Sequence, residues 1–194
     1  MPRKTKPLPA AVGVSDHSGW VILMTVAGDG TLLDRRRVEL VDSGLPTMPH
    51  HHDGQKLSID QAVALVERVR RSAERNAQAR LDALAAEIPE VSAIALRACP
   101  PLPATVAERI TNYRAMCVAD WVMYRQALAK AARERGWTVH WYDTKGVFAE
   151  AAGALRRESI DDLLNAAKQR VGSPWQKDHR TAMAAAIAAA HSRP

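Results

Sequence analysis

The 194-residue sequence lacks the features that would anchor, cross-link or export a protein. It has two cysteines, Cys99 and Cys117, and both lie among apolar residues, which indicates reduced core thiols rather than a disulfide framework. Its apolar runs are far too short to span a bilayer, and residues 1–9 lack the apolar core of a signal peptide. We therefore expect a cytoplasmic protein without a membrane span.

The sequence also lacks a glycine-rich phosphate-binding loop, which disfavours a phosphotransferase, and it shows no internal repeat. The length suits one domain, which we place over residues 9–194 behind a basic, proline-rich arm over residues 1–8. The formal net charge of +6 and the isoelectric point near 9.7 favour a polyanionic partner such as DNA or RNA. A solvated basic surface is the alternative.

The order of the predicted elements indicates a mixed α/β sheet covered by helices. Apolar, β-branched runs predict strands over residues 11–15, 20–26 and 32–41, and glycines 28 and 30 suit a hairpin turn. Ser58 and Gln61 form a capping box before a helix that ends near Ile88. Two further strands and four helical segments follow, over residues 91–99 and 137–142, and within 105–135, 146–156, 159–170 and 178–190.

Two aspartates carry a resemblance to a known family. Asp16 closes the first predicted strand in the run 12–16, and Asp178 opens the last helix, which has a small-residue face behind it. In this respect the chain resembles the ribonuclease H-like superfamily, most of all the RuvC-type Holliday-junction resolvases. The resemblance implies a mixed five-stranded sheet in the order βββ-α-β-α-β-α. It also implies that Asp16 and Asp178 bind divalent metal, Mg²⁺ or Mn²⁺, for phosphodiester hydrolysis, and that Lys145 matches a basic residue found after the fifth strand.

The sequence departs from that family at two acidic positions. Ala95 stands where the fourth strand of the family carries a glutamate, and Thr181 stands where the last helix carries a second acid. A two-metal site needs several carboxylates to balance the charge of its cations. With Asp16 and Asp178 alone, we expect weak Mg²⁺ binding unless other residues replace the missing ligands.

Candidate replacements lie next to the two aspartates and in two loops. His179 follows Asp178 and could serve as a ligand or general acid, as could His17 beside Asp16, with packing as the alternative. His51, in the loop 50–53, is a candidate ligand for a transition metal such as Mn²⁺, unless that loop is simply exposed. Asp143 follows the fifth strand and could join the metal site if that strand neighbours the first, or it could cap its own turn.

Candidate nucleic-acid contacts lie around the same positions. Trp175 could stack on a base or cover the edge of the sheet. Asp120 is expected to form a structural ion pair with one of the arginines flanking it, Arg114 or Arg125, rather than to face the site or cap a helix. The remaining candidates are basic residues near the fifth strand and the last helix, namely Lys145, Lys177 and Arg180.

Two functions follow from these patterns. One is a metal-dependent nuclease, and the other is a catalytically inactive module that binds nucleic acid or a protein. The first predicts that the carboxylates of Asp16 and Asp178 lie within about 8 Å of each other, because together they must span two metal ions. It also predicts that Asp16→Asn abolishes cleavage and leaves the fold intact. A homodimer is compatible with either function.

Overall fold

The computed structural model describes residues 9–192, so the predicted basic arm over residues 1–8 lies outside the described part of the chain. A five-stranded sheet in the order β3-β2-β1-β4-β5 forms its centre. β1, β2 and β3 pair antiparallel, whereas β1, β4 and β5 pair parallel, so the sheet is mixed as predicted. The strands are β1 (Ala10–Asp16), β2 (Trp20–Ala27), β3 (Leu32–Glu39), β4 (Val91–Arg97) and β5 (Thr138–Tyr142).

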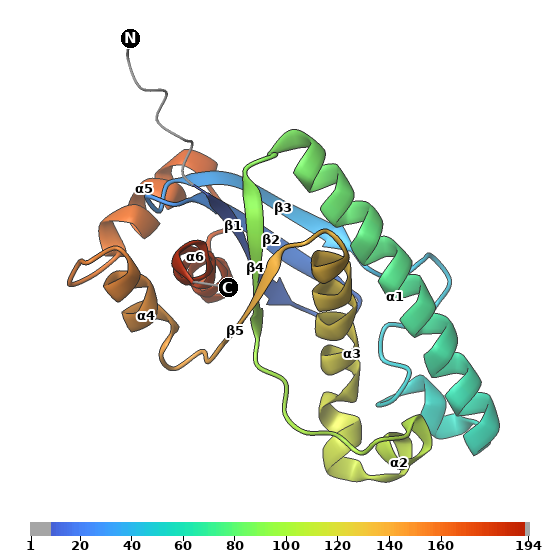
Figure 1. Cartoon of the computed structure of the whole chain (residues 1–194). Helices are drawn as coiled ribbons and strands as arrows, with labels where there is room; N and C mark the ends of the chain where they lie inside the picture. The colour runs from blue at the N-terminus through green and yellow to red at the C-terminus, as the bar shows by residue number, and fades with distance from the viewer. Residues whose placement is uncertain (1–8, 193–194) are drawn as a thin grey trace.

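Helices cover both faces of the sheet (Figure 1). On one face lie α1 (Ile59–Glu87), α2 (Val106–Thr111) and α3 (Tyr113–Glu134). On the other face lie α4 (Val147–Ala154), α5 (Asp161–Val171) and α6 (Lys177–His191). A short 3₁₀ helix, η1 (Asp53–Lys56), precedes α1. The sheet thus separates two cores, one against α1 and α3 and one against α4, α5 and α6.

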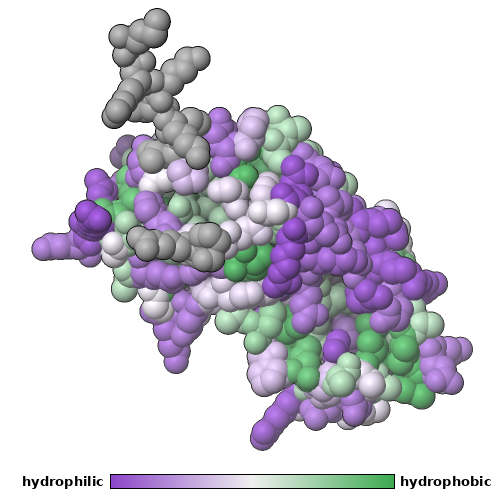
Figure 2. Space-filling view, viewed as in Figure 1, coloured by the Kyte–Doolittle hydropathy of each residue, from purple (hydrophilic) through white to green (hydrophobic). Residues whose placement is uncertain are grey.

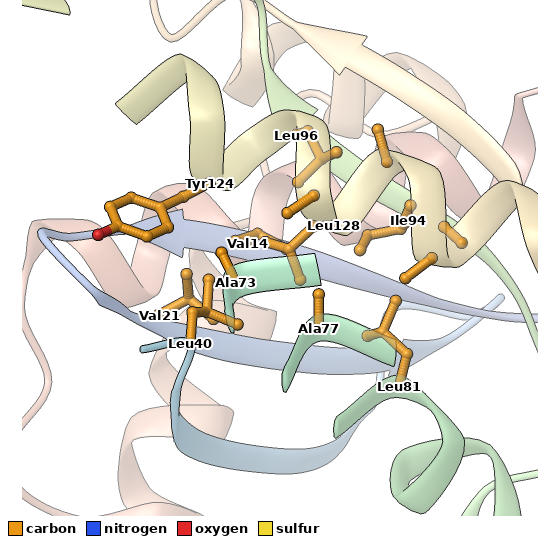
Figure 3. Close-up of a cluster of buried hydrophobic side chains, with 14 of the residues drawn as sticks. Val14, Val21, Leu40, Ala73, Ala77, Leu81, Ile94, Leu96, Tyr124 and Leu128 are labelled. Atoms are coloured by element: carbon orange, nitrogen blue, oxygen red, sulfur yellow. The ribbon is translucent and has the colours of Figure 1, made fainter. Parts of the chain in front are cut away.

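The core on the α1 side is built from aliphatic side chains of the strands and from both large and small side chains of the helices (Figure 3). Ala73, Ala77 and Leu81 of α1 face Val14 and Leu128 across this layer. The predicted capping box at the start of α1 is present. Ile59, the first residue of α1, is exposed, and the buried face of the helix begins with Ala62 and Leu65.

The core on the other side depends on the close approach of α6 to β1. A Cβ atom at Gly13 would lie 1.7 Å from the carbonyl oxygen of Ala182, so only glycine fits at this position of β1. The alanine-rich face of α6 (residues 182–190) makes this approach possible because its side chains are short. The last helix is therefore seated directly on the central strand of the sheet.

The helical region 105–135 differs from the single helix that the sequence predicts. It contains two helices, because Asn112 ends α2 in an extended conformation and its Oδ1 accepts the Ala115 N–H, which begins α3.

Both cysteines are free and half-buried. Hydrophilic side chains cover the outer face of α1, and hydrophobic ones gather near its N-terminal end (Figure 2). No helix within residues 9–192 has the length and apolar character needed to cross a membrane.

Candidate functional site

Asp16 lies on the α3 side of the sheet. It pairs across the antiparallel ladder with Val21, whose side chain belongs to the core beneath α1 and α3. Its Oδ2 accepts hydrogen bonds from Nη2 and Nε of Arg125 at 2.7 and 3.0 Å. Both side chains are buried, with 3% and 7% of their surface exposed. Arg125, one of the two partners expected for Asp120, is therefore bound to Asp16 instead.

Asp16 and Asp178 point to different sides of the sheet. Asp178 belongs to α6, which covers the opposite side of the sheet. The side chain of β1 that faces α6 near the strand end is Ser15, which pairs with Ile22 of the α6-side core. The two carboxylates belong to opposite faces of the sheet, because successive side chains of a strand alternate between faces and Asp16 shares the face of Val14.

The start of α6 brings Asp178 near His17. Asp178 is half-exposed in the first turn of the helix, where a carboxylate interacts favourably with the helix dipole. Its Oδ2 lies 3.7 Å from Nε2 of His17, which is too long for a hydrogen bond. The imidazole of His17 stacks on the indole of Trp20 with ring centroids 3.8 Å apart. His17, rather than Asp16, is therefore the residue of the β1 end that approaches α6.

His179, the third residue of α6, caps the start of that helix. Its Nδ1 accepts the backbone N–H of Gln176 at 3.2 Å, so the proton of the neutral ring is on Nε2. Burial of the ring, assisted by the positive charge of Arg35, lowers the pKa of His179 below its usual 6.5. In this arrangement Nδ1 is not available to a metal. The predicted catalytic role of His179 thus competes with an observed structural one.

Asp143 and Lys145 lie at the end of β5 in a tight turn. The Oδ1 of Asp143 accepts the backbone N–H of Lys145 at 3.1 Å, which is the alternative turn-capping role that the sequence allowed. β4 lies between β1 and β5, so Asp143 does not end a neighbour of the first strand. Both residues are exposed to solvent at the carboxyl edge of the parallel strands.

Asp120 holds the loop of residues 50–53, the histidine loop, against α3. Oδ1 of Asp120 accepts the backbone N–H of His50 at 3.0 Å and lies 2.8 Å from its ring Nδ1. Oδ2 accepts the backbone N–H of His51 at 3.1 Å. The side chains of His50 and Asp120 are almost completely buried. The expected ion pair of Asp120 with Arg114 or Arg125 is wrong, because this carboxylate instead ties the loop to α3.

The other predicted contacts with nucleic acid surround the start of α6. Trp175 is half-buried against the α6-side core, with its ring 5.9 Å from that of His179. Lys177 is exposed, and Arg180 is exposed in an ion pair with Asp161. Arg97 is also exposed, and it adds a cation at the carboxyl end of β4. The sequence analysis did not single it out.

A cavity of about 370 Å³ opens between the β1–β2 turn, β3 and the start of α6. The guanidinium carbon of Arg37 lies 3.7 Å from the centre of the Trp20 ring, and His17 lies at a similar distance. Two groups so close to one ring centre must occupy its opposite faces, so Trp20 is sandwiched between them. Sequence reasoning missed this cluster. The signal was the run 35–37, whose first and last arginines share one face of an alternating strand.

Comparisons with known proteins identify the architecture. Neither a family model nor a curated protein sequence matches the chain. Among solved structures, RuvC of Thermus thermophilus in complex with a Holliday junction substrate matches with 15% identity and a TM-score of 0.53, over 93% of this chain and 91% of that one. A second Thermus thermophilus RuvC structure matches with 16% identity and a TM-score of 0.50, over 92% of each chain.

The chain has a RuvC-like fold. The mixed sheet, its strand order and its flanking helices confirm the predicted ribonuclease H-like arrangement. At this level of identity the likeness concerns the fold, so the chemistry of this RuvC-like chain depends on its own residues.

The residues at the expected metal-ligand positions do not fit the divalent metal that the resemblance implies. On the α6 side, Ala95 is fully buried opposite Gly13, and Thr181 is buried on α6. Oδ2 of Asp16 is already bound to a guanidinium on the other side. Within the described residues, no three His, Cys, Asp or Glu side chains gather closely enough to hold a metal ion. The predicted metal set of Asp16, Asp178, Asp143 and His51 therefore contains no such group of three among the described residues.

Proposed function

We propose that this protein binds nucleic acid through its RuvC-like fold and does not cleave it by a metal-dependent reaction. The proposed lack of metal-dependent cleavage rests on the buried ion pair of Asp16 and Arg125. In a metal site the carboxylate would neutralise a cation bound from solvent. Here Arg125 neutralises it from within the protein, and Nη1 of the same guanidinium also donates to the carbonyl oxygen of Ala98 at 3.2 Å.

The nucleic-acid half of the proposal is supported by charge and by fold. The chain carries a formal net charge of +6. Four exposed cations lie along the edge where β4 and β5 end and α6 begins, namely Arg97, Lys145, Lys177 and Arg180. Open sheets with parallel strands bind their ligands at that edge. The similar RuvC structure from Thermus thermophilus holds a Holliday junction, so we propose branched DNA as the first ligand to test.

The test combines binding and cleavage on the same DNA. A fluorescein-labelled four-way junction and a duplex of the same composition are titrated with protein in EDTA, and complex formation is followed by anisotropy. The same complexes are then incubated with Mg²⁺ or Mn²⁺ and analysed on denaturing gels. We expect metal-independent binding that weakens steeply with salt, and intact strands with either ion. Mn²⁺-dependent cleavage would support the nuclease hypothesis instead. Absence of binding at low salt would refute both the proposed function and the nuclease hypothesis.

A further inference from the structure

Three exposed arginines form a row along the outer face of α1. They are Arg68, Arg71 and Arg75. Side chains three and four residues apart share one face of a helix, and this row extends over about 10 Å of the helix axis. Ala73 and Ala77, on the opposite face of α1, pack against the sheet. The row therefore points into solvent, where hydrophilic side chains cover the helix (Figure 2).

Two arginines of the row have no counter-charge. In the part of the chain that the structure describes, neither Arg68 nor Arg71 forms an ion pair, although other residues of α1 form several. Arg75 pairs with Asp42, but both side chains are largely exposed, so this pair contributes little. Like charges three and four residues apart destabilise a helix slightly. A bound polyanion would turn this repulsion into attraction.

The carboxylates beside the row are already bound to other cations. Glu67 and Glu74 both accept hydrogen bonds from Arg70, and Glu74 also pairs with Lys130. Together with Asp42, three carboxylates face five cations in this region, namely these two and the three arginines of the row. The region thus keeps an excess of two positive charges on the outer side of α1.

We propose that Arg68, Arg71 and Arg75 form a second contact surface for the DNA backbone, separate from the edge where α6 begins. This inference rests on the proposed nucleic-acid binding and adds a contact to it. α1 and α6 cover opposite faces of the sheet, so the row meets a different stretch of DNA from Lys177 (Figure 1). Successive phosphates of a strand are about 3.4 Å apart along the axis, so the row spans about three of them. A second arm of a branched DNA provides such a stretch.

The experiment measures how binding of a fluorescein-labelled four-way junction depends on salt. Arg68→Gln/Arg71→Gln removes the two arginines without a counter-charge, and glutamine has a helix propensity close to that of arginine. Each lost phosphate contact makes the slope of log K against log salt shallower by about one unit. We expect a slope shallower by about two units. Between about 50 and about 200 mM salt, the affinity of the variant should therefore fall about tenfold less than that of the wild type.

A matched double variant separates the row from net charge. Arg80→Gln/Arg133→Gln also removes two exposed arginines, one further along α1 and off the row and one near the end of α3. It should keep the wild-type slope. Equal slopes of the two double variants would overturn this inference and leave the proposed function intact. Absence of junction binding by the wild type at low salt would refute the proposed function itself.

A triple variant tests whether the two surfaces are separate. Adding Lys177→Gln to Arg68→Gln/Arg71→Gln should make the slope shallower by about one further unit, because contacts at distant sites contribute independently. If Lys177→Gln changes the slope of the wild type but not that of the double variant, the two surfaces are not independent, and the inference is wrong. Far-ultraviolet circular dichroism should show the same helix content in every variant, since each substitution is at an exposed position.

Discussion

The guanidinium of Arg125 and the carboxylate of Asp16 are joined by two hydrogen bonds, although 109 residues separate them in the chain. The pair links the end of the central strand to the middle of α3. Removing one partner of a buried pair leaves the other charge without compensation, which costs more than the pair contributes when it is intact. Asp16 is therefore a structural residue of the α3 side, and its substitution should affect folding.

Asp16→Asn tests this relationship. We expect the free energy of unfolding in urea to fall by about 3 kcal/mol or more, because the buried Arg125 charge loses its counter-charge. The double variant Asp16→Asn/Arg125→Met removes both charges and should recover much of the loss. Wild-type stability of the single variant would contradict the structural role and agree with the metal-ligand role that the sequence suggests.

Asp120→Asn should loosen the histidine loop. An amide cannot accept the N–H groups of both His50 and His51, because one of its two terminal atoms is itself a donor. We expect a loss of about 2 kcal/mol or more in urea unfolding, and faster hydrogen exchange at these two amides. Asp53→Asn is the matched control, since Asp53 is exposed at the start of η1, next to the same loop. Equal effects of the two substitutions would refute the assignment.

Lys177→Gln should weaken DNA binding without altering the fold. Lys177 is exposed at the first position of α6 and forms no ion pair within residues 9–192. If it contacts a phosphate, the slope of log K against log salt should become shallower by about one unit. Arg133→Gln, remote from this edge, should leave the slope as in the wild type. Identical slopes in both variants would place the phosphate contacts elsewhere.

His179 should make stability depend on pH. Burial and the nearby Arg35 lower its folded-state pKa, so the unfolded chain binds the proton more tightly. The contribution of neutral His179 is fully present above the unfolded pKa of about 6.5 and is lost as pH falls below it. Two further groups act on this ring: the carboxylate of Asp178 raises the pKa of His179, and His17 lowers it. His179→Gln, which keeps a capping side chain at this position, should flatten the pH dependence of the urea midpoint between about pH 7 and 5.

The fold could be predicted because its signals are local. The capping box of Ser58 and Gln61, the turn glycines and the apolar runs each depend on neighbouring residues, and all of them fixed elements close to their observed bounds. The break at Asn112 was missed because asparagine in an apolar-periodic stretch is also tolerated inside a helix. Its capping role depends on the extended backbone that the residue adopts.

The site could not be predicted to the same extent, because β1 is buried on both faces. Its residues from Ala10 to Ser15 show no alternation of polar and apolar side chains, so the sequence does not reveal which of them face α6. The close contact of Gly13 with α6 determines which residues of β1 face that helix. The partners of Asp16 and Asp120 are also set by tertiary packing, which brings α3 against the sheet in one case and against the histidine loop in the other.

The alternation along β1 has a practical consequence for protein engineering. Anyone attempting to install a metal centre in this scaffold would begin from Ser15, whose side chain faces the start of the last helix, and not from the aspartate beside it. Ser15→Asp would place a carboxylate on the same side of the sheet as Asp178, whereas added acids near Asp16 would compete for Arg125. A shift of one residue along an extended chain thus decides whether an acidic side chain holds the protein together or is available to a ligand.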